Sequence, residues 1–154
     1  MSRPEAGQSA PDFTLEADDG STVSLTDLAG TTVALYFYPK DDTTGCTAEA
    51  CEFRDLSADY DAAGVCIIGV SPDPITKHVK FRDKHGLGFT LLSDPEHVAA
   101  EAYGVWVEKS MYGKTYMGIE RSTFVIGPDG VLIEAFYKVK PKGHAASVLG
   151  LVTA

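Results

Sequence analysis

The feature that most constrains this chain is an apolar run, TTVALYFYP, that ends at Pro39 and precedes a helical pattern starting at about Thr44. β-Branched and aromatic residues fill the run, so it predicts a buried central strand from Thr32 to Tyr38. Cys46 lies in the first turn of the helix that follows. There it faces unpaired backbone N–H groups and the positive end of the helix dipole, which favour a thiolate over a thiol. The pattern therefore predicts a nucleophilic cysteine at a strand-to-helix junction.

The rest of the chain alternates between short strand patterns and helical patterns, with no internal repeat and no dividing linker. Further strands are predicted near Asp12 and Val23, from Val65 to Ser71, near Leu92, and in a hairpin around residues 128–130. Helices are predicted from about Thr44 to Ala63, Pro74 to Lys84, Pro95 to Gly104 and His144 to Val152. This order indicates a single α/β domain over residues 1–154, with helices on both faces of a central mixed β-sheet. A cysteine at the helix start of a βαβ unit suggests a thioredoxin-like fold.

Charge and composition argue against several classes of protein. The 154 residues carry a net charge of −9, which argues against nucleic acid or an anionic membrane as the main partner. No segment approaches the roughly 20 apolar residues of a membrane helix, and residues 1–13 lack the apolar stretch of a secretory signal. The expected compartment is therefore the reducing cytoplasm. Three cysteines form no disulfide scaffold, and paired cysteines in that compartment are more often catalytic than structural.

The helix start alone does not keep Cys46 ionised. A free thiol titrates at about pH 8.5, so ionising most of it at neutral pH requires roughly 2.7 kcal/mol. The helix terminus supplies about 0.3–1 kcal/mol, and Asp41, Asp42 and Glu49 would oppose ionisation if they faced the sulfur. A cation from elsewhere in the chain is therefore required. Arg121 is the best candidate, because it stands alone before the strand pattern STFVIG and its fork of donors suits two adjacent oxygens.

Two positions before the cysteine have both a functional and a structural interpretation. The Thr43 hydroxyl can reach over the first helical turn, but a plain N-cap role for Thr43 or Thr44 explains the same pattern. Pro39 is equally well explained as a strand terminator. The combined spacing Pro-x-x-x-Thr-x-x-Cys, with a remote arginine, is more specific than any of its parts.

Cys51 bears on the mechanism through its distance from Cys46. In a regular helix, residues five apart have Cα atoms about 8–9 Å apart, whereas a disulfide needs them within about 7 Å. The two thiols therefore cannot bond while this helix is intact. Either the pair is unrelated, or the helix start unwinds during turnover. Cys66 lies in the apolar run VCIIGV and is expected to pack in the core.

Taken together, these motifs resemble the peroxiredoxin family, specifically its bacterioferritin comigratory protein or peroxiredoxin Q group. The resemblance covers nearly the whole chain and rests on APDFTL, LYFYPKDDTTGCTAEACEFRD, FTLLSD and YGVWVEKSMYGKTYMGIERSTFVIGPDG. The family's proline, threonine, peroxidatic cysteine and distal arginine match Pro39, Thr43, Cys46 and Arg121. Glu49 falls where relatives often carry a glutamate that orients the arginine, and Cys51 matches a helix-borne resolving cysteine. Thr44 departs from the pattern, because many relatives have proline there.

The resemblance implies a thiol-dependent peroxidase with no metal, haem or flavin. Cys46 would attack hydrogen peroxide or an organic hydroperoxide and become a sulfenic acid, under a cover provided by the family's proline. Arg121, the Thr43 hydroxyl and the backbone N–H groups at Gly45 and the cysteine would hold the two oxygens. Cys51 would then close a disulfide, which thioredoxin or a similar dithiol reductant would reduce. A monomer or weak homodimer is also implied.

Two competing functions fit parts of the pattern. A thioredoxin-type disulfide oxidoreductase would carry C-x-x-C at the helix start, whereas this chain has C-x-x-x-x-C. A peroxide sensor or thiol-based binding module would use the same cysteine but stop after one equivalent of peroxide. Catalytic turnover with a thioredoxin system distinguishes the sensor from the enzyme.

The remaining polar and aromatic residues have simpler interpretations. Asp73 and Asp94 follow strand ends and are expected to be turn and cap residues. Surface positions, without metal-ligand spacing, are expected for the histidines His78, His85, His97 and His144. Either an apolar approach for organic peroxides or ordinary packing explains the run Tyr103, Trp106, Met111, Tyr112, Tyr116 and Met117.

Overall fold

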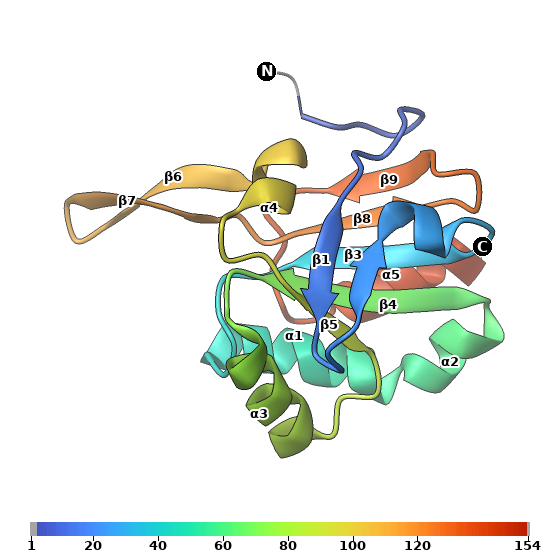
Figure 1. Cartoon of the computed structure of the whole chain (residues 1–154), viewed down its shortest axis with the longest axis horizontal. Coiled ribbons are helices and arrows are strands. Elements are labelled where there is room, and N and C mark those ends of the chain that lie inside the picture. The colour runs from blue at the N-terminus through green and yellow to red at the C-terminus, as the bar shows by residue number, and fades with distance from the viewer. Residues whose placement is uncertain (1–2, 154) are drawn as a thin grey trace.

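A computed structural model describes residues 3–153 of the chain. Its centre is a seven-stranded sheet in the order β2-β1-β5-β4-β3-β8-β9 (Figure 1). These strands are β1 (Thr14–Ala17), β2 (Thr22–Ser24), β3 (Thr32–Phe37), β4 (Val65–Ser71), β5 (Thr90–Ser93), β8 (Ser122–Ile126) and β9 (Leu132–Phe136). β4 pairs in parallel with β3 and β5, and the other neighbours are antiparallel. The predicted mixed sheet is therefore confirmed.

Helices cover both faces of this sheet (Figure 1). They are η1 (Leu25–Leu28), α1 (Thr44–Asp55), α2 (Ser57–Ala62), α3 (Ile75–His85), α4 (Val98–Ala102) and α5 (His144–Thr153). One core cluster joins the sheet to α1, α2, α3 and α5, and a second joins its other face to α4 and the N-terminal segment. The helices therefore lie on both faces, as predicted, with the larger group on the face that carries α1.

Strand β3 supplies side chains to both clusters. Val33, Leu35 and Phe37 point into the cluster with α4, while Ala34 and Tyr36 point into the cluster with α1. Because both faces of a central strand are covered, apolar residues are required at successive positions rather than at alternate ones. This explains the continuous apolar run in the sequence, and it gives the segment that leads to Cys46 a rigid base.

The predicted single helix over Thr44 to Ala63 is wrong in its length. The chain leaves helical geometry at Leu56, where φ is −101° and ψ is 5°, and so divides into α1 and α2. Beyond the break, Tyr60 is fully buried and its hydroxyl donates to the Ala145 carbonyl oxygen at 2.6 Å. This tertiary contact, which has no signal in the local sequence, accompanies the change in helix direction.

A two-stranded hairpin, β6 (Trp106–Met111) and β7 (Lys114–Ile119), projects from the body of the molecule and was not predicted from the sequence (Figure 1). Tyr112 and Gly113 form its turn, with φ values of 53° and 78°. Two successive positive φ values are typical of a tight hairpin turn, which Asn-Gly or Asp-Gly usually signals. The aromatic run does not form one surface, since Tyr103 is buried while Tyr112 is 98% exposed.

Two of the four histidines are buried, so the expectation of surface positions is wrong for them. His78 and His144 are 0% and 7% exposed, and each ring has a polar partner within the fold. A buried imidazole is stable only with such partners, and sequence spacing does not reveal them. None of the helices in residues 3–153 is long and apolar enough to span a membrane.

Candidate active site

Cys46 lies in the first turn of α1, just beyond the C-terminal end of β3. Thr43 is the N-cap residue, with an extended backbone of φ −82° and ψ 158°. Cys46 is the third residue of the helix and is only 1% exposed. Backbone N–H groups in a first turn have no partner within the helix. The sulfur therefore sits at the positive end of α1 and out of bulk water, where a nearby charge acts strongly.

That charge comes from Arg121, which strand register places beside the helix. β8 runs antiparallel to β3 and pairs Ser122 with Phe37, the last residue of β3. Arg121 Nη2 donates to Cys46 Sγ at 3.3 Å, and Nη1 donates to Glu49 Oε1 at 2.6 Å. Burial opposes the charge on Arg121, but Glu49 and Cys46 raise the pKa of its guanidinium above the ordinary value. The cation is therefore held between a thiol and a carboxyl group of the same helix.

Glu49 is fully buried one turn after Cys46. Burial raises the pKa of its carboxyl group to about 7, although Arg121 acts in the opposite direction. Within residues 3–153, neither Glu49 Oε2 nor the buried hydroxyl of Tyr36 has a hydrogen-bond partner. A carboxyl group that is buried and only half satisfied favours its neutral form. Near neutral pH Glu49 therefore opposes ionisation of the sulfur less than a full negative charge would.

Gly45 makes the close approach of Arg121 possible. A Cβ at this position would lie 3.2 Å from Arg121 Nη2 and 3.4 Å from Cγ of Pro141. The first distance is shorter than ordinary van der Waals contact between such atoms. The absence of a side chain at Gly45 thus leaves room for the guanidinium beside Cys46.

Thr43 and Pro39 lie on the approach to the helix. The Thr43 hydroxyl donates to the Lys40 carbonyl oxygen at 3.1 Å, and among the described residues it makes no side-chain cap to the helix. Thr43 therefore occupies the N-cap position, as the structural interpretation expects, but its exposed hydroxyl bonds the loop before the helix instead of capping the helix. Pro39 is half-buried two residues after the end of β3.

Two further side chains near the arginine were missed by sequence reasoning. Burial, and then the charge of Arg121, lower the pKa of Lys109, which projects from β6. The same two causes lower the pKa of His144 to about 4, and its Nε2 lies 2.7 Å from Thr123 Oγ1. Both groups lie far from Cys46 in the sequence, so no motif around the cysteine indicates them.

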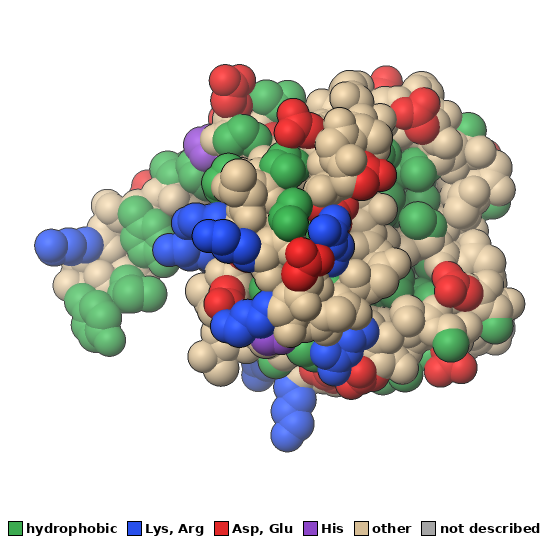
Figure 2. All heavy atoms as spheres, turned by 60° about the horizontal axis from the view of Figure 1, so that its bottom comes forward, with side chains coloured by type: hydrophobic (Ala, Val, Ile, Leu, Met, Phe, Trp, Pro, Cys, Tyr) green, Lys and Arg blue, Asp and Glu red, His purple; other side chains and the backbone are tan. Residues whose placement is uncertain are grey.

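Lys and Arg side chains gather on one part of the surface despite the net charge of −9. Figure 2 shows them on the β6–β7 hairpin and across the middle of the face, with some Asp and Glu among them, whereas the part of the face farthest from the hairpin shows Asp and Glu. Exposed lysines flank the site at Lys40, before α1, and at Lys140 and Lys142, beside Pro141. Such a local field attracts anions.

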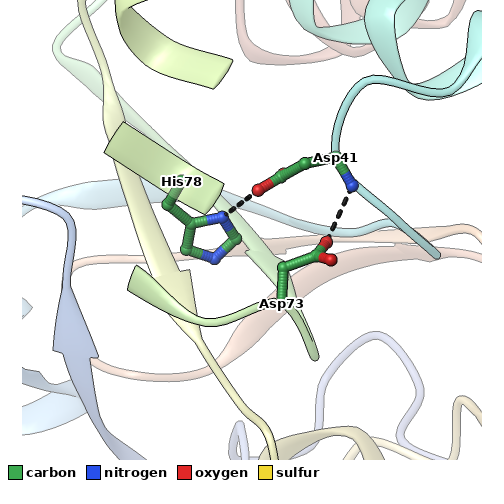
Figure 3. Close-up of side chains that lie close together, drawn as sticks. All are labelled: Asp41, Asp73 and His78. Atoms are coloured by element: carbon green, nitrogen blue, oxygen red, sulfur yellow. Dashed lines mark hydrogen bonds and ion pairs between the residues drawn. The ribbon is translucent and has the colours of Figure 1, made fainter. Parts of the chain in front are cut away.

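A buried polar cluster of Asp41, Asp73 and His78 holds the loop before α1 (Figure 3). Asp41 Oδ2 lies 2.6 Å from His78 Nδ1, and the Asp41 backbone N–H donates to Asp73 Oδ2 at 2.7 Å. The three residues include the ligand types of a metal site. However, the facing atoms of Asp41 and His78 bond each other, and Asp73 Oδ2 also accepts from Ser71. The cluster is therefore satisfied as a hydrogen-bond network.

The other two cysteines are free. Cys51 is half-buried in α1, and the continuous helix between it and Cys46 agrees with the expectation that the two cannot bond in this conformation. Cys66 pairs with Val33 at the opposite end of β3 from the site. It is half-buried against the core, and burial, followed by Asp61, raises the pKa of its thiol.

A thioredoxin-like sheet with a buried thiol, an arginine and a carboxyl group at one helix start defines a class of thiol-based redox enzymes. The model of the AhpC/TSA family matches residues 6–135. The chain is 54% identical over 145 residues to peroxiredoxin Bcp of Bacillus subtilis, covering 94% of this chain and 92% of that protein. It is 46% identical to peroxiredoxin Bcp of Escherichia coli, with coverage of 94% and 93%.

Solved structures give the same result. A structure of Xanthomonas campestris peroxiredoxin Q matches with a TM-score of 0.90 and 41% identity, covering 96% of each chain. The chain therefore belongs to the AhpC/TSA family, and within it to the Bcp, or peroxiredoxin Q, group of peroxiredoxins. This assignment sets aside the C-x-x-C disulfide oxidoreductase considered above.

Proposed function

We propose that this peroxiredoxin reduces hydrogen peroxide and organic hydroperoxides through Cys46, with Cys51 as its resolving cysteine. The observation that carries the proposal is the contact of Arg121 Nη2 with Cys46 Sγ at 3.3 Å, in a site that also contains Glu49. A fixed cation beside a buried sulfur favours the thiolate, which is the nucleophilic form. The whole of residues 1–154 is proposed to act as one domain.

In the first step, the Cys46 thiolate attacks the terminal oxygen of the hydroperoxide. An S–O bond forms as the O–O bond breaks, and the electron pair leaves with the alkoxide or hydroxide, which takes up a proton. Arg121 stabilises the thiolate before the step and the charge on the leaving oxygen during it. The backbone N–H groups of Gly45 and Cys46 and the Thr43 hydroxyl hold the two oxygens.

Two neighbouring residues, Glu49 and Pro39, keep the arginine and the sulfur in place for this step. Glu49 keeps the guanidinium of Arg121 turned towards the sulfur through the 2.6 Å contact. Pro39 covers the sulfur and limits the entry of water. The Cys46 product is a sulfenic acid, which a second peroxide can oxidise further to a sulfinic acid.

In the second step, the Cys51 thiol condenses with the sulfenic acid, giving a disulfide and one molecule of water. The start of α1 must unwind for this step, because the two Cα atoms of an intact helix lie too far apart. Thioredoxin or a similar dithiol then reduces the disulfide by exchange, and its own two thiols become a disulfide. No metal, haem or flavin takes part.

The names of the relatives support this proposal. A structural study of the Xanthomonas campestris bacterioferritin comigratory protein, 41% identical to this chain, describes an alkyl peroxide reduction activity. We further propose that the enzyme works in the cytoplasm as a monomer or weak homodimer. The negative charge of the whole chain supports the absence of nucleic acid and anionic membranes among its main partners.

The test is intact mass after one equivalent of peroxide, together with peroxide consumption in a thioredoxin system. We expect the wild type to lose two hydrogens and Cys51→Ser to gain one or more oxygens at Cys46. Cys46→Ser should consume no peroxide, while Cys66→Ser should behave as the wild type. If Cys51→Ser still forms an internal disulfide, the resolving role passes to Cys66. A single turnover without catalytic recycling would instead identify a sensor.

A further inference from the structure

The loop before α1 is tied to the rest of the fold mainly through the side chain and backbone of Asp41. The carboxylate accepts from the Tyr38 hydroxyl at 2.5 Å and contacts His78 Nδ1 at 2.6 Å. The backbone N–H donates to Asp73 at 2.7 Å. Asp41, His78 and Asp73 are at most 7% exposed. These contacts attach the loop to α3 and to the turn after β4, both outside the helix that carries Cys46 (Figure 3).

The geometry around His78 favours its charged form. Its Nδ1 faces the Asp41 carboxylate, and its Nε2 lies 2.8 Å from the Leu92 carbonyl oxygen. Both partners are acceptors, so both ring nitrogens donate. Burial opposes the charge, but Asp41 raises the pKa of His78 above its usual value. The contact is therefore a buried, charge-assisted hydrogen bond, which is stronger than a neutral one.

The exposed contact of the same loop is weaker. Lys84 Nζ lies 2.8 Å from Asp42 Oδ2, with side chains that are 61% and 49% exposed. Exposed ion pairs of this kind contribute little to stability. The loop is thus held mainly by the buried contacts of Asp41, among which the contact with His78 is the charge-assisted one that joins the loop to α3.

We propose that the Asp41–His78 contact controls how readily the start of α1 unwinds, and thereby how the Cys46 sulfenic acid divides between two fates. Condensation with Cys51 forms an S–S bond, releases water and requires the unwound start. Reaction with a second hydroperoxide adds one oxygen to the sulfur, releases an alcohol or water, and uses the folded site. Both residues are positioning residues, because they touch neither the sulfur nor the arginine. The proposal rests on the proposed function, which supplies Cys51 as the resolving thiol.

The experiment uses His78→Asn, and also Asp41→Asn, which keeps the side chain's shape and removes its charge. Each variant receives one equivalent of hydrogen peroxide, is quenched with an alkylating reagent at successive times, and is weighed intact. We expect the disulfide to form about tenfold faster than in the wild type, a change that corresponds to about 1.4 kcal/mol. In excess peroxide, the sulfinic form should accumulate about tenfold more slowly per turnover. The rate of the first peroxide step should change by less than about threefold.

Tyr103→Phe is the matched control. It removes a partly buried hydrogen bond to the Pro11 carbonyl oxygen, at 2.7 Å, without touching the loop before α1. This control should leave the division between disulfide and sulfinic acid unchanged. The proposal is overturned if both variants of the pair form the disulfide at the wild-type rate or more slowly, or if Tyr103→Phe shifts the division equally. A wild type that forms no Cys46–Cys51 disulfide would refute the proposed function instead.

Discussion

Replacing Arg121 by Gln tests the electrostatic basis of the site. The guanidinium Nη2 lies 3.3 Å from Cys46 Sγ. Two unit charges at that separation interact by about 5 kcal/mol at an effective dielectric constant of 20. The net effect is smaller, because the guanidinium charge is delocalised and Arg121 also contacts Glu49 at 2.6 Å. Loss of one preorganised donor at a site of developing charge typically costs about 2.7–4 kcal/mol.

The expected result is a fall of about 100-fold to 1,000-fold in the second-order rate constant of Cys46 with hydrogen peroxide. Arg121→Lys should fall between this variant and the wild type, since an ammonium keeps the charge but lacks the planar fork that reaches both Cys46 and Glu49. Stopped-flow measurement of the first turnover, under excess enzyme, separates this step from recycling by the reductant. Iodoacetamide alkylation between pH 5 and about 9 gives an independent measure of thiolate content.

Arg82→Gln is the control for removal of an arginine, because Arg82 pairs with Asp18 on a different part of the fold. It should leave both measurements unchanged. If Arg121→Gln reacts within about threefold of the wild type, the cation does not activate the sulfur and the reasoning from the 3.3 Å contact is wrong.

Three further predictions follow from the site. Burial raises the pKa of Glu49 from 4.5 to about 7. Between these pH values the folded protein keeps a proton on Glu49 that the unfolded chain has lost, so Glu49 makes the free energy of unfolding fall as pH rises from about 4.5 to about 7. The pKa of His144 is lowered from 6.5 to about 4, so the unfolded chain binds a proton there more readily than the folded protein does. His144 therefore makes the free energy of unfolding fall as pH drops from about 6.5 to about 4. In urea titrations between pH 4.5 and 6.5, the free energy of unfolding of Glu49→Gln, measured relative to the wild type, should therefore rise with pH, and that of His144→Gln should fall. Differences from the wild type that do not change with pH would contradict both assignments. Gly45→Ala should slow the peroxide step about tenfold by displacing Arg121, and it should not destabilise the helix, because alanine has the higher helix propensity. Gly150→Ala is the control: its added Cβ would have nothing within 4 Å, so the rate of the peroxide step should stay unchanged. A normal first-turnover rate for Gly45→Ala would show that the guanidinium accommodates the methyl group.

Much of the architecture was predictable because its causes are local. The strand over β3 was evident from its apolar residues, and the glycine at position 86, with φ of 61°, ends α3 as a helix C-cap does. The hairpin of β6 and β7 was missed because Tyr112 stands where asparagine usually marks a tight turn. The division of the long helix at Leu56 was missed because it depends on contacts across the core.

In the site, too, some features follow from the local sequence and others only from the tertiary structure. The place of Cys46 at the start of a helix, five residues before Cys51, depends on neighbours along the chain and is determined by the sequence alone. The 3.3 Å approach of Arg121 depends on the register of β8 against β3, and the burial of Glu49 depends on how α1 packs. The buried His78 and Asp41 contact joins segments 37 residues apart. Only the tertiary structure decides these, because a charge acts on a buried sulfur through distance in space rather than position in the chain.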